Sequence, residues 1–410
     1  MIEKGTGLAS GIRDFFRDLN ISNVSTGLIP PFLMSLGLFA VTIEVISSTG
    51  ISPEQVQAWV IAIHVVGPII GIILSLYYKN PIAGAYSIPG MFVAVGAFEF
   101  YNINQVFGAA LIAGILVLIL GLTGWIKRAV SYIPMPILMA MVAGVLFKWG
   151  MGIVDAFNDN HLLIVIGLLG YVFFRRVFPK IPAVLGTFIF GAVAAGFMKM
   201  YQPIGAFNFS PTTPLFCMPE FSLGAFFSVS IPLAILVIGA ENMQAIAILK
   251  GLGFKPPINA MTIISGIGGV VASLFGGHNG NIAGPLTAVA ASEEGGPVEK
   301  RYVSAVFCNV VLILFGTFAA VVMSLLDLLP APLISLVIGL VMLSIISGAL
   351  ETAFATKKFR VGTFFSLIIA ISGVSIFQIG APFWAVVIGC IMSFFVEPGD
   401  FQVNKEVESL

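Results

Sequence analysis

Long apolar segments recur along almost the whole of this 410-residue chain, and each approaches the roughly 20 residues that cross a lipid bilayer as a helix. Hydrophobic residues make up 58% of the sequence and charged residues only 9%, whereas about a quarter of a soluble protein is charged. We therefore predict an all-α polytopic membrane protein. The 19 basic and 19 acidic residues balance, which excludes the basic face that a nucleic-acid partner would need.

The apolar pattern divides into fourteen predicted transmembrane segments. They begin near Leu28, Ala58, Ile82, Gln105, Val130, Leu162, Pro182, Ala225, Pro257, Ile282, Tyr302, Pro332, Val361 and Pro382. If both termini are cytoplasmic, every lysine and arginine except Lys148 and Lys199 falls on the cytoplasmic side, as the positive-inside rule requires. We expect a multi-pass protein of the plasma or inner membrane, with the lipid bilayer as its surroundings.

Fourteen segments give seven in each half, and an odd number places two related halves in opposite orientations, as inverted repeats. Residues 87–99 align without gaps on residues 281–293, and the identical pairs include Gly90 with Gly284. The predicted domains are an N-terminal interfacial helix (1–27), a first repeat (28–200), an extracytoplasmic connection (201–222), a second repeat (223–398) and a cytoplasmic tail (399–410).

A short amphipathic pattern precedes the first apolar segment. Ile12, Phe15, Phe16 and Leu19 recur at the spacing of one helix face, and arginines and aspartates fill the other face. This pattern is typical of a helix that lies in the membrane interface.

The third and tenth segments are both interrupted by helix-breaking residues. Asn80-Pro81 and Ser87-Ile-Pro-Gly90 interrupt the third, and residues 276–281 interrupt the tenth. Proline and glycine disfavour a continuous helix, and non-helical backbone at membrane depth needs protein or a watery cavity around it. We predict a short extended stretch followed by a half-helix in each segment, with the two half-helix N-termini facing each other. Their free N–H groups and positive dipole ends would form an anion site without a basic side chain.

Two ionisable residues complete the predicted site. Glu241 lies near the middle of the eighth segment, where an ionisable group is costly and marks a functional position, so we expect it to couple transport to protons. His278 lies in the second break. Two roles are compatible with this position, namely proton coupling and support of the irregular backbone. The predicted substrate-binding residues are Ser87, Ile88, Pro89, Gly90, Glu241, Asn242, His278, Asn279, Gly280, Asn281, Ile282, Ala283 and Gly284.

Other polar residues are expected to be peripheral or structural. We place His64 and His161 at the membrane interface and assign Glu99 and Glu293 to the solvated ends of the half-helices. The three cysteines lie too far apart for a zinc site or a disulfide framework, and we expect no metal and no cofactor. The sequence carries no HExxH pattern, so an enzyme is not expected.

Several short stretches resemble the motifs of one family. They are Ala85-Tyr-Ser-Ile-Pro-Gly90, Gly253-Phe-Lys-Pro-Pro257, Phe275-Gly-Gly-His278 with Asn281-Ile-Ala, Lys300-Arg-Tyr302 and Ile379-Gly-Ala-Pro-Phe-Trp384. These stretches resemble the motifs of the BenE-type benzoate:proton symporters, and they spread over most of the chain. The resemblance implies the fold of the uracil transporters and sulfate permeases, with core segments 1–4 and 8–11 and gate segments 5–7 and 12–14.

The same resemblance implies proton-coupled symport of a small aromatic carboxylate by alternating access. One position departs from the family, which usually has Gln-Asn where this chain has Glu241-Asn242, and uracil-type carriers place a glutamate in this span. A proton-coupled nucleobase permease and a channel-like anion conductor therefore stay open as alternatives. The sequence leaves the oligomeric state open, and a homodimer is compatible with it.

Overall fold

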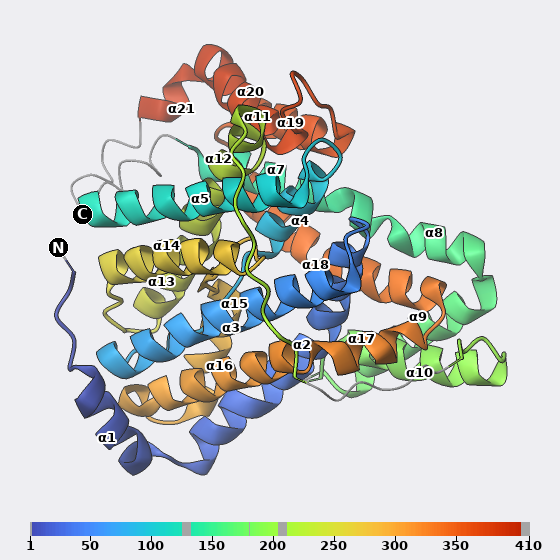
Figure 1. The fold of residues 1–410 in the computed structure, drawn as a ribbon, viewed down its shortest axis with the longest axis horizontal. Coiled ribbons are helices and arrows are strands. Elements are labelled where there is room, and N and C mark those ends of the chain that lie inside the picture. Colours follow the sequence, from blue (N-terminus) through green and yellow to red (C-terminus); the bar gives the residue numbers. More distant parts are fainter. Residues whose placement is uncertain (1, 125–132, 180, 204–210, 403–410) are drawn as a thin grey trace.

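The computed structural model describes residues 2–124, 133–179, 181–203 and 211–402. These residues form a bundle of apolar helices (Figure 1). Six of the described helices are long and apolar enough to cross a membrane, or seven if a pair bent by 62° counts as one span. The predicted start near Val130 and parts of the predicted connection (204–210) and tail (403–410) lie outside the described residues.

The first half of the chain carries nine described helices and one short strand. They are α1 (Leu8–Asp18), α2 (Ile21–Ser47), α3 (Pro53–Tyr78), β1 (Gly84–Ala85), α4 (Ile88–Ala97), α5 (Ile103–Thr123), α7 (Met135–Gly150), α8 (Gly152–Asp159), α9 (His161–Val177) and α10 (Ala183–Phe197). Three of the long helices begin at a capping box, in which two side chains satisfy free N–H groups reciprocally. The boxes pair Asn20 with Asn23, Ser52 with Gln55, and Asn102 with Gln105. Because of the first box, α2 begins at Ile21, inside the range assigned to the N-terminal helix.

The second half begins with an interrupted helix. The segments α11 (Leu223–Ala225), η1 (Phe226–Ser230), α12 (Ile231–Ile235), η2 (Leu236–Asn242) and α13 (Met243–Gly251) follow one another directly, and η1 and η2 are π-helical turns. The remaining elements are α14 (Ile258–Leu274), β2 (Asn281–Ile282), α15 (Gly284–Ala290), η3 (Glu293–Gly295), η4 (Val298–Lys300), α16 (Tyr302–Thr317), α17 (Ala319–Asp327), α18 (Ala331–Phe354), α19 (Arg360–Ser372), α20 (Ala381–Val396) and α21 (Pro398–Gln402).

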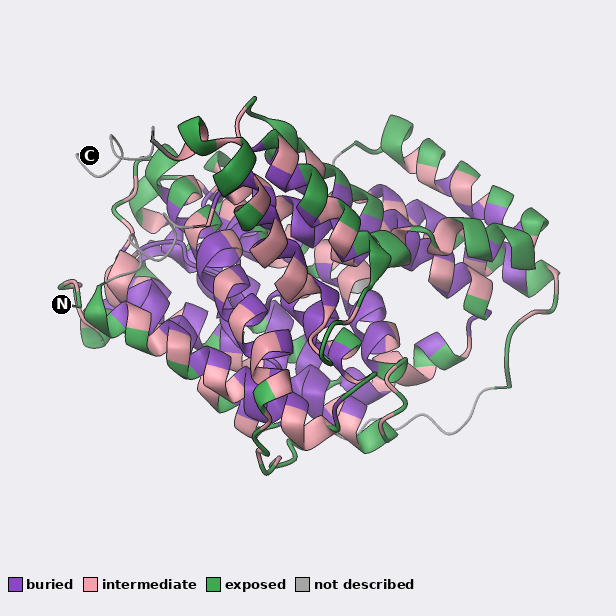
Figure 2. Cartoon of the chain, turned by 90° about the horizontal axis from the view of Figure 1, so that it is seen from above, coloured by how far each residue is buried: buried purple, intermediate pink, exposed green. Residues whose placement is uncertain are grey.

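The helices pack in two groups. The first group contains α2, α3, α5, α14 and α16, and Figure 1 shows α5, α14, α3 and α16 lying side by side. The second group contains α7, α9, α10, α18, α19 and α20, with α7 packed against both α18 and α19. Buried residues gather in the body of the bundle, whereas the arm formed by α8, α9 and α10 presents many exposed faces (Figure 2). Exposed apolar side chains on that arm, such as Leu169 and Phe197, fit contact with lipid.

The N-terminal helix turns its carboxylates inward and its apolar residues outward. Asp14 and Asp18 are buried, whereas Ile12 and Phe16 are 51% and 70% exposed. Asp14 pairs with Lys79 at the end of α3, and this hydrogen bond, together with the charges of Lys79 and Arg17, lowers the pKa of the Asp14 carboxyl to about 2. The exposed side of the helix carries these apolar residues together with Arg13 and Arg17, whose side chains are 78% and 69% exposed. That the helix lies in the membrane interface stays a prediction.

Candidate functional site

The two interrupted segments meet inside the bundle. Strands β1 and β2 pair antiparallel, with Gly84 opposite Ile282 and Ala85 opposite Asn281, and short helices α4 and α15 follow them. The prediction of an extended stretch followed by a short helix in each segment is confirmed. The pairing supplies backbone hydrogen bonds that an extended chain cannot make within itself.

Side chains from neighbouring helices bond further groups of the extended backbone. The Ser75 hydroxyl on α3 donates to the Ile82 carbonyl at 2.8 Å. The amide oxygen of Asn309 on α16 accepts from the Gly84 N–H at 2.8 Å, and Thr287 Oγ1 accepts from the Ala83 N–H at 3.1 Å. All three polar side chains are buried. Non-helical backbone is therefore tolerated here because protein groups replace the missing water.

His278 and Asn279 fix the start of α4. The Ser87 N–H donates to Asn279 Oδ1 at 3.1 Å, and the Ser87 carbonyl lies 3.0 Å from His278 Nε2. The Trp59 indole donates to His278 Nδ1 at 2.9 Å, and because an indole N–H can only donate, Nδ1 carries no proton. The ring proton is then on Nε2 and donates to Ser87. Both ring nitrogens of His278 are engaged in hydrogen bonds within the protein, which favours support of the backbone over proton coupling.

We expect His278→Phe to destabilise the protein without altering the pH profile of its remaining activity. The substitution keeps an aromatic ring but leaves the Trp59 N–H unpaired and removes one of the two hydrogen bonds to the Ser87 carbonyl, at a cost of about 2 kcal/mol. Thermal unfolding and uptake measured across pH check this. His161→Phe on exposed α9 is the matched control. A shifted pH profile in the His278 variant would restore the proton-coupling role.

Ser87 also caps α4. Its hydroxyl accepts from the Gly90 N–H at 3.1 Å, and its carbonyl accepts from the Met91 N–H at 2.9 Å. The first N–H groups of a helix have no acceptor within the helix, and Pro89 has no N–H. Within the described residues, the Ile88 N–H has no hydrogen-bond partner. It is therefore available to an anion at this N-terminus.

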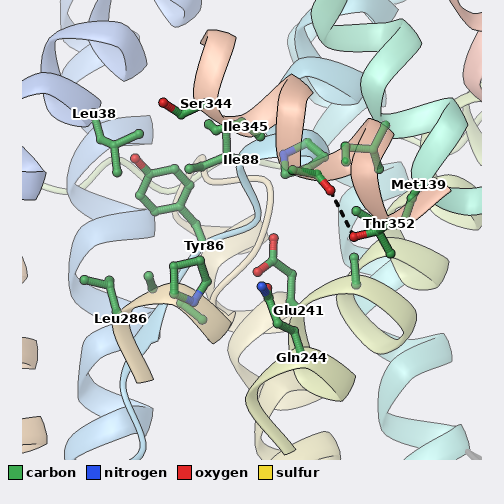
Figure 3. A pocket seen from close by; sticks show the side chains of 18 of the residues that line it. Leu38, Tyr86, Ile88, Met139, Glu241, Gln244, Leu286, Ser344, Ile345 and Thr352 are labelled. Carbon is green, nitrogen blue, oxygen red and sulfur yellow. Dashed lines mark hydrogen bonds between the residues drawn. The ribbon is translucent and has the colours of Figure 1, made fainter. Parts of the chain in front are cut away.

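A cavity of about 800 Å³ lies against this N-terminus, between the two packing groups (Figure 3). Its volume falls within the range of about 300–1,000 Å³ found for small-molecule sites. Of the predicted site residues, Ile88, Pro89, Glu241 and Ala283 line it. Those that do not line it are Ser87, Gly90, Asn242, His278, Asn279, Gly280, Asn281, Ile282 and Gly284.

Most of the cavity wall is apolar, and it includes Leu38, Met139 and Leu286. Glu241 lies in the π-turn η2 and is only 8% exposed. Figure 3 shows Glu241 and Gln244 projecting together from one helix into the space below Ile88. The apolar wall and the single buried carboxyl together suit a small ligand with both a hydrophobic body and a polar group.

Asn242 points in another direction. Its amide oxygen accepts from the Ser265 hydroxyl on α14 at 3.1 Å, and the side chain is 1% exposed. Asn242 therefore ties η2 to the first packing group instead of facing the cavity.

The cavity opens toward one end of the bundle. Its lining residues Gln244, Ala247 and Glu351 are exposed, and they lie toward the C-terminal ends of α13 and α18, near Lys250 and Lys357. Phe39, His64 and Tyr86 at the other end are buried. Solvent therefore reaches the cavity from the side where these lysines lie.

His64 differs from its predicted interfacial position. It lies in the middle of α3, is 2% exposed and lines the cavity. The sequence contained the signal, because an ionisable residue inside an apolar segment of spanning length marks a functional position. His161 is exposed at the start of α9, as a peripheral residue should be.

A bundle with two broken segments meeting beside a largely apolar cavity is the architecture of a membrane transporter. The fold is similar to the transmembrane domain of the cyanobacterial bicarbonate transporter BicA, with a TM-score of 0.61, 14% identity, and coverage of 91% of this chain and 97% of that one. It is also similar to murine Slc26a9, described as an anion transporter in the inward-facing state, with a TM-score of 0.53, 15% identity, and coverage of 90% and 68%.

Sequence comparison identifies the family. Residues 17–395 match the family model BenE, benzoate membrane transport protein, so the chain belongs to that family. It is 27% identical to the Inner membrane protein YdcO of Escherichia coli over 375 residues, covering 88% of this chain and 95% of that one. It is 25% identical to the Benzoate membrane transport protein of Acinetobacter baylyi over 381 residues, covering 93% and 96%. The chain is a multi-pass membrane transport protein.

Proposed function

We propose that this protein is a secondary active transporter that carries a small aromatic carboxylate of the benzoate type together with a proton. The observation that carries the proposal is the buried Glu241 carboxyl, which faces a largely apolar cavity beside the N-terminus of α4. The family and the name of the Acinetobacter relative support the substrate class.

The substrate carboxylate would bind at the start of α4. No described residue bonds the Ile88 N–H there, and the helix dipole adds roughly half a positive charge, which favours an anion. Pro89 and the Ser87 cap keep this end of the helix in place. The aromatic ring would lie against Leu38, Met139 and Leu286, where burying apolar surface stabilises the complex.

Glu241 would couple substrate to proton. Among the described residues that line the cavity, none is a lysine or an arginine. Two carboxylates that share a site of low polarity cannot both be ionised, so one of them must take a proton. Substrate and proton would therefore enter together, and one proton per monoanion would move no net charge.

We also propose the fourteen-segment inverted repeat, with core and gate domains as the family resemblance implies. The helix pairs α3 with α16 and α5 with α14 support it, because exchanging the two predicted halves converts one pair into the other. In this arrangement both termini are cytoplasmic. The cavity, which opens on the side of Lys250 and Lys357, would then face the cytoplasm, and α7 with α18 would form the moving wall. One chain supplies the whole cavity wall, so the mechanism does not require the homodimer.

A proton-coupled nucleobase permease is the second candidate. The adjacent Glu241 carboxyl and Gln244 amide offer an acceptor and a donor–acceptor pair, which suits the N–H and C=O edge of a neutral ring. Adding uracil or xanthine during uptake of labelled benzoate separates the two candidates. Strong inhibition is expected only if the protein is a nucleobase permease.

Uptake into proteoliposomes tests the main proposal. We expect labelled benzoate to accumulate when the side that carries substrate is acidic, and to equilibrate only when the two sides have equal pH. Saturation of the initial rate distinguishes a carrier from a channel-like conductor. Accumulation of nucleobases but not of any aromatic acid would overturn the proposal.

A further inference from the structure

The buried end of the cavity carries two polar side chains that the proposed mechanism does not use. His64 and Tyr86 both line it, and they are 2% and 6% exposed. Their ring centroids lie 4.8 Å apart, so they form one continuous wall. Their hydrogen bonds determine what this wall can offer to a ligand.

The contacts of His64 assign the position of its ring proton. Nδ1 lies 2.9 Å from the Val60 carbonyl, which can only accept a hydrogen bond. A neutral imidazole has one N–H, so that proton is on Nδ1 and Nε2 is an acceptor. Within the described residues, Nε2 has no hydrogen-bond partner. A buried acceptor at a cavity wall therefore awaits a donor from the ligand.

The contacts of Tyr86 lead to the same result. The Thr42 hydroxyl lies 2.8 Å from the Leu38 carbonyl and donates its only proton there. Thr42 and Tyr86 are 2.6 Å apart, so the Tyr86 hydroxyl must be the donor in that pair. The oxygen of Tyr86 keeps its own acceptor capacity. His64 and Tyr86 thus both offer an acceptor.

We propose that His64 and Tyr86 form an acceptor site for a hydrogen-bond donor on the substrate ring, such as a hydroxyl or an amino group. This inference rests on the proposed function, because it assumes that an aromatic acid binds with its carboxylate at α4. The cavity volume of about 800 Å³ lies in the upper part of the usual range for small-molecule sites, so ring substituents can be accommodated. The substrates would then include ring-hydroxylated or ring-aminated aromatic acids as well as the unsubstituted acid.

Competition against labelled benzoate uptake in proteoliposomes tests the inference. The competitors are the three hydroxybenzoates and the matching methoxybenzoates, which keep the oxygen but lack the donor. We expect at least one hydroxy isomer to compete about tenfold better than its methoxy partner, the upper end of what one neutral hydrogen bond contributes. His64→Phe should remove that preference, so that the hydroxy and methoxy isomers compete equally within this variant.

Two further variants make the outcome decisive. Phenylalanine can preserve the ring contacts of His64 with Phe39 and Tyr86, and His64→Gln restores an acceptor and should recover part of the preference. His161→Phe, outside the cavity, should behave like the unaltered protein. Equal competition by hydroxy and methoxy isomers, or a preference that survives His64→Phe, would overturn the inference. If benzoate itself is not transported, the proposed function fails instead.

Discussion

Replacing Glu241 by glutamine should abolish proton-driven accumulation and leave substrate exchange intact. A gradient of about two pH units can drive a one-to-one symporter to roughly 100-fold accumulation, because each unit corresponds to about 1.4 kcal/mol. The glutamine side chain has the shape of a protonated glutamate but cannot release a proton. Accumulation by Glu241→Gln should therefore fall to about onefold, while exchange of internal for external substrate continues.

Glu99→Gln provides the matched control, because it makes the same chemical change at an exposed residue just after α4, outside the cavity. Both variants and the unaltered protein are compared in the same proteoliposomes, first with a gradient and then in exchange. The exchange assay shows whether each variant still binds and moves substrate. Undiminished accumulation by Glu241→Gln would refute the coupling role of this residue.

The breaks in the third and tenth segments could be predicted because their causes are local. Proline and glycine act on the backbone of their own segment, so the residues around Ser87 and Gly280 indicated extended chain without knowledge of the fold. Glu241 could be found for a similar reason, since a carboxyl in an apolar segment is conspicuous wherever the helix packs. Local chemistry was sufficient for these features.

The hydrogen bonds that hold the interrupted segments could not be predicted, because the residues that they join are distant in the sequence. Trp59 and His278 are 219 positions apart, and His278 and Ser87 are 191 apart. Asn309 reaches β1 from α16, across 225 positions. No pattern within one segment indicates that a particular asparagine will satisfy a particular backbone N–H. The same limitation left His278 with two open roles until its two hydrogen bonds were known.

His64 illustrates a different limit. Its residue type and its segment were visible in the sequence, but whether a helical residue faces lipid, protein or a cavity depends on how the helix is rotated. Helix α3 has apolar residues on all sides, because it packs against β1, α14 and α16 at once. A helix that is hydrophobic all round gives no amphipathic signal from which its rotation could be inferred.

Replacing Gly67 by alanine should cost about 3 kcal/mol or more and lower the yield of folded protein. A Cβ at Gly67 would lie 1.8 Å from the carbonyl oxygen of Ala85, far inside van der Waals contact. That oxygen belongs to β1, which β2 holds from another side, so the backbone cannot move away. Overpacking of this kind typically costs about 1–3 kcal/mol and more where the neighbour is rigid backbone.

Gly96→Ala separates this effect from a general response to added methyl groups, because a Cβ at Gly96 on α4 meets no atom within 4 Å. That variant should unfold at the same temperature as the unaltered protein or slightly higher, since alanine favours helix over glycine by about 0.5–1 kcal/mol. Thermal unfolding and size-exclusion profiles of the purified proteins measure both. A Gly67→Ala protein as stable as Gly96→Ala would mean that α3 does not press against β1, and the support for the crossing of the two broken segments would be lost.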